Sequence, residues 1–237
     1  MKDFLKYSQS EFIEAFSKDD NQVFWVPSDT EKLFKKNCKK HPKQMEYWIK
    51  NSFSYTINKY GFRCPSFDDM SDNPKLMSVG CSYTFGVGLP EHGIWPRMLA
   101  DELNLELYNL AVPGGSADSV YRTIKIWFQK IKPNIVVWFQ PPGTMSRSEK
   151  FTEEDIIKYG PFYPDRSETD KDYIKWMNNK NLEAIKYLIG DTPLVHQKEW
   201  ITNHIIDYAR DLNHRGFEDH KLLYKEIYRK VENNEYT

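Results

Sequence analysis

The sequence predicts an α/β fold of three layers, in which a central parallel sheet lies between helices on both sides. Short apolar runs recur beyond residue 75, and Ile135–Phe139 is apolar throughout, as in a strand that is buried on both faces. The segments between these runs carry apolar residues at helical spacing. Alternation of strands and helices of this length implies a parallel sheet that is covered on both sides.

The main domain is predicted to begin near Lys75, just before the first strand, Leu76–Gly80. A helix with Pro96 in its first turn follows, and then a second strand at Leu105–Leu110. The apolar stripe of this helix consists of Trp95, Met98, Leu99 and Leu103.

The next helix is expected to start after Ser116, whose side chain can cap it, and to end before Pro133. Its stripe consists of Val120, Ile124, Trp127, Phe128 and Ile131. Beyond the third strand, Leu194 and Val195 form a weaker fourth one. The last helix carries His220, Leu223, Ile227 and Val231 on one face, where His220 is expected to be a core histidine with a hydrogen-bond partner.

Residues 1–74 are interpreted as an N-terminal extension of helical and strand pieces that packs on the main domain, residues 75–237. Phe53, Tyr55 and Ile57 alternate with polar residues, which is typical of a half-buried strand. The stretch Asn58–Arg63 reads N-K-Y-G-F-R and is expected to be a packing element that borders the site.

Composition limits the partners of the protein. The net charge is −1, so no global field draws the chain to nucleic acid or to an anionic membrane, and the lysine-rich residues 32–43 are interpreted as a solvated helix face. The start of the sequence lacks the apolar core of a signal peptide, and no apolar stretch is long enough to span a bilayer. Cys38, Cys64 and Cys81 are interpreted as thiols in a reducing compartment, so a cytoplasmic or virion-associated protein is expected.

Three sequence blocks follow the predicted strands, at the edge of the sheet where ligands of such folds bind. Ser82 lies between Gly80 and Gly86, directly after the first strand, where backbone N–H groups favour developing negative charge. Gly114 follows the second strand and can present a bare N–H group. Asp211 and His214 stand three apart before the last helix, so the carboxylate can fix the tautomer of the imidazole.

Together these blocks resemble the SGNH/GDSL hydrolase family over residues 75–230, and G-C-S-x-T-x-G is similar to a subgroup from environmental bacteria and phages. The resemblance implies a flavodoxin-like arrangement with Ser82 as nucleophile, His214 as base and Asp211 as its partner. It also implies an oxyanion hole formed by the N–H groups of Ser82 and Gly114. No metal or cofactor is required.

Two residues depart from the family pattern. Cys81 replaces the aspartate of G-D-S, and Gly143 stands where the third block normally offers an asparagine. Losing one oxyanion donor costs about 10²- to 10³-fold in rate. Gln140 and Arg147 are the candidates to replace that donor, and Tyr83 and Arg147 are the candidates to bind substrate.

The sequence therefore predicts a serine ester hydrolase that acts on a small-molecule or glycan ester. An acyltransferase with the same site and a non-catalytic, virion-associated binding module remain alternatives. A thiolate of Cys81 is a less favoured nucleophile. A zinc site at His196 and His204 lacks ligand spacing, and Gly86-x-Gly88 lacks the lysine of a phosphate-binding loop. The stretch Glu149–Lys180 is interpreted as a lid, a recognition insertion or a variable surface loop.

Overall fold

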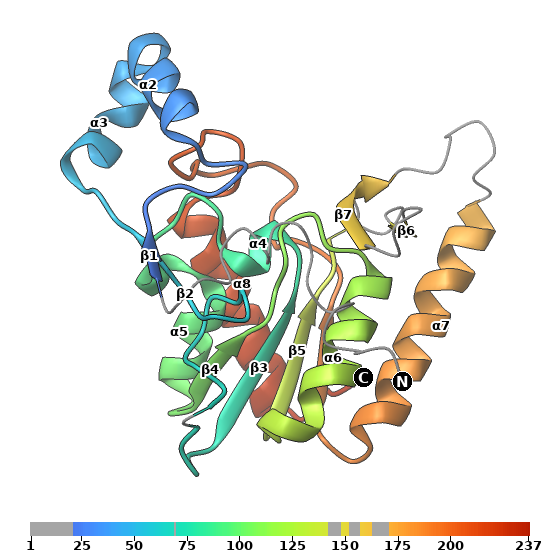
Figure 1. Cartoon of the computed structure of the whole chain (residues 1–237). Coiled ribbons are helices and arrows are strands. Elements are labelled where there is room, and N and C mark those ends of the chain that lie inside the picture. The colour runs from blue at the N-terminus through green and yellow to red at the C-terminus, as the bar shows by residue number, and fades with distance from the viewer. Residues whose placement is uncertain (1–20, 69, 142–147, 152–156, 163–170) are drawn as a thin grey trace.

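The computed structural model describes residues 21–68, 70–141, 148–151, 157–162 and 171–237 (Figure 1). At its centre is a parallel sheet of four strands in the order β4-β3-β5-β8. The strands are β3 (Lys75–Gly80), β4 (Glu106–Asn109), β5 (Ile135–Phe139) and β8 (Leu194–Gln197). The predicted α/β class and all four strands are confirmed, with the fourth extending two residues beyond Val195.

The strand order reverses at β3, which defines the edge where a ligand is expected. The chain runs from β3 outward to β4, and then returns past β3 to form β5 and β8 on its other side. In the register of the sheet, Leu76 pairs with Leu107 on one side and with Ile135 on the other. Open sheets of this kind bind ligands outside the carboxyl ends of the strands, at the point where the order reverses.

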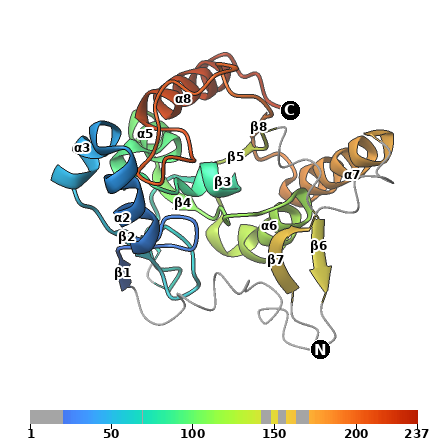
Figure 2. The same cartoon turned by 90° about the horizontal axis from the view of Figure 1, so that it is seen from above.

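Helices cover both faces of the sheet, as Figure 2 shows from above. Helices α5 (Trp95–Glu102) and α8 (Phe217–Glu232) pack on one face, where Leu76 and Val137 are buried. Helices α6 (Ala117–Ile131) and α7 (Lys171–Ile189) pack on the other, where Met77 and Val136 are buried. Successive residues of a strand face opposite layers, so the continuous apolar runs fill both cores.

Local chemistry fixes the ends of α6. The side chain of Ser116 accepts a hydrogen bond from the N–H of Ser119, and the Ser119 hydroxyl accepts one from the N–H of Ser116, which makes a reciprocal capping box. The helix ends at Ile131 because Lys132 adopts the left-handed conformation, with φ of 51°, before Pro133.

Of the three interpretations of Glu149–Lys180, the plain surface loop is wrong, while the lid and the recognition insertion stay predictions. Within the described residues, β6 (Ser148–Phe151) and β7 (Ile157–Phe162) pair as an antiparallel hairpin, and α7 begins at Lys171. Along α7, Trp176 is exposed, whereas Leu182, Ile185 and Ile189 are buried. The fully buried face of the helix therefore lies in its second half.

In its described part, from residue 21 onward, the N-terminal extension contains two short strands and two helices. Strand β1 (Asn21–Val23) pairs antiparallel with β2 (Tyr55–Ile57), and α2 (Glu31–Lys40) and α3 (Pro42–Lys50) lie between them in sequence. Side chains of the extension form two apolar clusters with residues 85–94, 111 and 209. The division into domains at residue 75 stays a prediction. Within the part of the chain that the structure describes, no helix combines the length and apolar character needed to cross a membrane.

Candidate active site

Ser82 occupies a sharp turn between β3 and the short helix α4 (Ser82–Phe85). The preceding Gly80 has a φ of 151°, and a Cβ there would come within 2.7 Å of the Phe139 carbonyl oxygen. Only glycine therefore fits where the chain leaves β3. Ser82 itself is the first residue of α4, and no hydrogen bond uses its N–H within the described chain.

Two buried side chains fasten the α4 turn to the rest of the domain. Asn109, the last residue of β4, donates its amide N–H to the Thr84 carbonyl oxygen over 2.9 Å. Arg63 donates to the carbonyl oxygens of Phe85, Gly86 and Leu89, each over 2.9 Å. Burial lowers the pKa of the Arg63 guanidinium to about 10, which leaves it charged at neutral pH. A cation at the carboxyl end of a helical turn is favourable because the dipole of the turn is negative there.

The stretch N-K-Y-G-F-R forms the turn that delivers Arg63. The Asn58 side-chain oxygen accepts hydrogen bonds from the N–H groups of Tyr60 and Phe62, each over 3.0 Å. Gly61 has a φ of 84°, and Phe62 is buried in the core between the sheet and α6. The expected packing element thus holds the turn of the predicted nucleophile, a role that the sequence alone did not reveal.

Asp211 and His214 form the predicted pair. Asp211 Oδ2 lies 2.6 Å from His214 Nδ1, and Asp211 Oδ1 accepts the N–H groups of Asn213 and His214 over 3.1 and 3.0 Å. Leu212 has a φ of 54°, which folds the segment back so that the carboxylate meets the imidazole. Both side chains are buried. A carboxylate at Nδ1 holds the proton there and leaves Nε2 as the basic nitrogen.

The α4 turn and the Asp211–His214 segment lie side by side. The rings of Tyr83 and His214 have centroids 5.1 Å apart, and the Tyr83 ring also lies 5.2 Å from the Trp200 ring. Within the described residues, Ser82 Oγ makes no hydrogen bond with His214. Catalytic hydrogen bonds are often long in unliganded sites and shorten when the substrate binds.

Gly114 lies in a tight turn that is tied to the end of β3. The Gly115 N–H donates to the Val112 carbonyl oxygen over 2.8 Å, and the Val112 N–H donates to the Gly80 carbonyl oxygen over 3.1 Å. Pro113 and Gly114, whose φ is 81°, occupy the central positions that favour these residues in a type II turn. Among the described residues, no atom lies within 4 Å of a Cβ built on Gly114, so this face of the turn is open to them.

Of the two candidates for the third oxyanion donor, Gln140 lies within the described residues. Gln140 is buried, donates from its amide to Asn178 Oδ1, and lies 3.0 Å from His196 Nε2 through its oxygen. A carboxamide has two N–H groups, so at most one remains for an oxyanion. Gly143 and Arg147 lie outside the described residues.

Of the other histidines that the sequence analysis considered, His204 is exposed, whereas His196 is half-buried and His220 is buried, each beside a tryptophan ring. Burial, followed by nearby lysines, lowers the pKa of His196 to about 3, and its ring stacks on Trp138 at 4.2 Å. Nδ1 of His220 accepts a hydrogen bond from the backbone N–H of Trp95 over 3.1 Å, and burial lowers the pKa of His220 to about 3. Its expected place in the core is confirmed. Among the described residues, no group of three His, Cys, Asp or Glu side chains is arranged to hold a metal ion.

No protein-family model matches the sequence, and no curated protein matches it significantly. Among solved structures, a G-D-S-L family lipolytic protein of Desulfitobacterium hafniense DCB-2 is 14% identical with a TM-score of 0.40, covering 66% of this chain and 99% of its own. The psychrotrophic esterase EstA of Pseudoalteromonas sp. is 12% identical with a TM-score of 0.35, and covers 66% and 74%. TesA is 12% identical with a TM-score of 0.39, and covers 66% and 97%. These are proteins of the kind that the motifs resemble, and similarity at this level carries no argument about activity.

Proposed function

We propose that this protein is a serine ester hydrolase with Ser82 as nucleophile. The observation that carries the proposal is the buried hydrogen bond of 2.6 Å between Asp211 and His214, beside the turn that holds Ser82. A buried carboxylate bonded to Nδ1 orients an imidazole and stabilises its protonated form, which is what a general base next to a hydroxyl nucleophile requires.

The mechanism uses residues of this chain alone. His214 Nε2 takes the proton from Ser82 Oγ as that oxygen attacks the ester carbonyl. The N–H groups of Ser82 and Gly114 donate to the oxyanion of the tetrahedral intermediate. The imidazolium, stabilised by Asp211, then protonates the leaving alcohol, and a water molecule activated by the same imidazole releases the acid from Ser82.

The proposed substrate class is supported by the side chains near the nucleophile. Tyr83 lies beside His214, and Trp200 lies beside Tyr83, so aromatic side chains that suit an acyl group or the face of a sugar ring are near the imidazole. We therefore propose a small-molecule or glycan ester as substrate. An acyltransferase would use the same residues and would differ only in preferring an acceptor alcohol over water.

Two observations favour a second candidate, a binding module of the same fold without catalysis. Ser82 Oγ makes no hydrogen bond with His214 in the described chain, and an amide N–H of Gln140 is already donated to Asn178. A site with a misaligned nucleophile and fewer oxyanion donors would bind an ester or glycan without cleaving it.

A fluorophosphonate probe read out by intact mass tests the proposal. The wild-type protein is expected to take up one adduct, which the variants Ser82→Ala and His214→Ala lose. Cys81→Ala is the matched control, because the replaced thiol is the neighbouring candidate nucleophile, and it is expected to keep the adduct. A folded wild type that takes up no adduct contradicts the hydrolase and favours the binding module, and an adduct that Ser82→Ala keeps contradicts Ser82 as the nucleophile.

A further inference from the structure

We infer that four side chains of the N-terminal extension, Asp29, Asn37, Tyr55 and Arg63, are positioning residues for the site, and we call them the clamp. The inference rests on the proposed function, which it deepens by assigning a role to a part of the chain that lies outside the family resemblance. The clamp holds the Asp211–His214 segment from one side and the α4 turn from the other.

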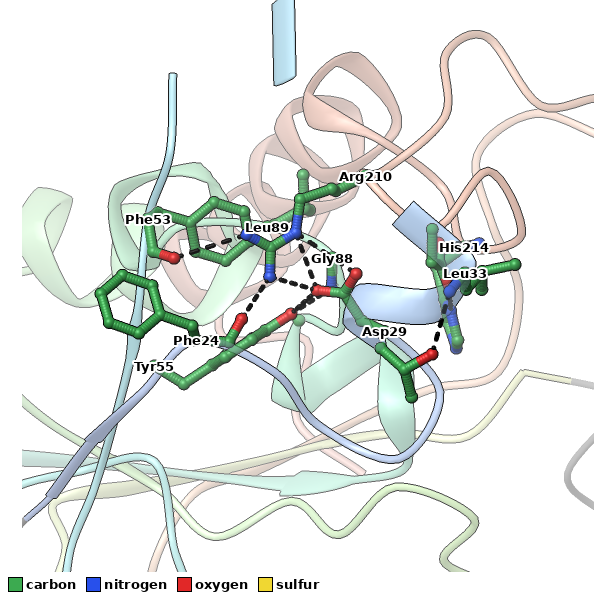
Figure 3. Close-up of polar contacts among 12 residues, drawn as sticks. Phe24, Asp29, Leu33, Phe53, Tyr55, Gly88, Leu89, Arg210 and His214 are labelled. Carbon is green, nitrogen blue, oxygen red and sulfur yellow. Dashed lines mark hydrogen bonds and ion pairs between the residues drawn. The ribbon is translucent and has the colours of Figure 1, made fainter. Parts of the chain in front are cut away.

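The first contact of the clamp is a buried ion pair next to Asp211. The Arg210 guanidinium donates to Asp29 Oδ2 from Nη2 over 2.6 Å and from Nε over 3.0 Å (Figure 3). The same guanidinium donates to the Phe24 carbonyl oxygen and lies 3.9 Å from the centroid of the Phe53 ring. Every one of these partners belongs to the extension, so the residue before Asp211 is anchored there.

The second contact reaches Asp211 itself. Asn37, a buried residue of α2, donates its side-chain N–H to the Asp211 carbonyl oxygen over 3.0 Å. The carboxylate of Asp211 meanwhile accepts from His214 and from two backbone N–H groups. The backbone of Asp211 is thus fixed by the extension, and its side chain is left to orient the imidazole.

A closed ring of hydrogen bonds joins this segment to the turn that follows Ser82. The Gly88 carbonyl oxygen accepts the Arg210 N–H over 3.0 Å, and the Gly88 N–H donates to the Tyr55 hydroxyl over 2.8 Å. The Tyr55 hydroxyl donates in turn to Asp29 over 2.5 Å, which closes the ring (Figure 3). The Arg63 guanidinium lies over the Tyr55 ring, 4.9 Å from its centroid, while it holds three carbonyl oxygens after Ser82.

The chemistry of the clamp fits positioning better than simple cohesion. A buried ion pair can usually be replaced by well-packed apolar residues with no loss of stability. Its donors and acceptors are directional, and here they converge on the backbone of residues 85–89 and 210–211. Small displacements of a catalytic group lower the rate strongly, so fixing these two backbone segments sets the distance between Ser82 and His214.

The test compares Asn37→Leu with Asn181→Leu. Both replace a buried asparagine by a side chain of similar size, but Asn181 donates to the Asp118 side chain on α6 and to the Met177 carbonyl oxygen within α7, and to neither the α4 turn nor the Asp211–His214 segment. Three quantities are measured on the full chain: the rate of fluorophosphonate labelling as a function of pH, the proton resonance of His214 Nδ1–H, and the midpoint of thermal unfolding.

Asn37→Leu is expected to label at least tenfold more slowly and to shift or broaden the Nδ1–H resonance, with a loss of midpoint no larger than that of Asn181→Leu. Asn181→Leu is expected to label within twofold of the wild type and to keep the resonance. Tyr55→Phe, which keeps the ring and removes the hydroxyl, is expected to behave like Asn37→Leu. Labelling and resonance that are unchanged in both Asn37→Leu and Tyr55→Phe would overturn the clamp. If the wild type takes no label, the proposed hydrolase fails, and the His214 resonance still decides the inference.

Discussion

Replacing His220 by asparagine is expected to make the free energy of unfolding less sensitive to acid. Burial lowers the pKa of His220 from its ordinary value of 6.5 to about 3. Between these two values the unfolded chain binds a proton that the folded chain does not, so the stability is complete above pH 6.5 and is lost as the pH falls toward 3. From pH 6 to pH 5 this loss amounts to about 1.2 kcal/mol for one such histidine.

His196 has a pKa lowered to the same extent, so the two histidines together are expected to cost the wild type about 2.4 kcal/mol over that pH unit. In His220→Asn, the side-chain oxygen can still accept the Trp95 N–H, and the titrating group is gone. The loss between pH 6 and pH 5 should therefore be halved, to about 1.2 kcal/mol.

Urea unfolding followed by tryptophan fluorescence at pH 6.0, 5.5 and 5.0 measures the loss. His204→Asn, at an exposed histidine, is the matched control and should keep the slope of the wild type. An unchanged slope in His220→Asn would refute the reasoning, because it would mean that the buried imidazole takes up its proton without unfolding.

Three substitutions test the backbone conformation at two residues and the cap of one helix. Gly88→Ala should lower the midpoint of thermal unfolding and the rate of fluorophosphonate labelling together, because its Cβ would lie 2.7 Å from the Ala209 Cβ; Gly190→Ala, which also has a positive φ but open space, should leave labelling unchanged. Lys132→Gly should raise the free energy of unfolding by about 0.5–1 kcal/mol in urea titrations, because the residue is left-handed, and a loss would contradict this account. Ser116→Ala should lower it by about 1 kcal/mol in the same titration through loss of the cap, whereas Ser116→Asp should retain most of it.

The sheet and most helices could be predicted because their signals are local. The apolar residues of Ile135–Phe139 are needed on both faces, and Ser116 and Pro133 mark the two ends of α6 with side-chain chemistry that acts within one turn. The Asp211–His214 pair was equally accessible, since three residues separate two groups that meet through one turn.

The supports of the site could not be predicted in the same way. Nothing near Arg63 or Arg210 in the sequence indicates that their partners are backbone carbonyls of residues 85–89 or the carboxylate of Asp29. Such partners are specified only by the assembled fold. Gln140 shows the same limit, because the strand end predicts its position, while its amide is directed by Asn178 and His196 from two other elements.

The ion pair between Asp29 and Arg210 is expected to form late when the protein folds. Its two residues are 181 positions apart, so during synthesis Asp29 leaves the ribosome long before its partner exists. The contacts of β3, β4 and α6 are closer in sequence and cost less loop entropy to form. A refolding chain should therefore regain its helical signal first and its reactivity toward a serine probe last, when the two ends of the sequence meet.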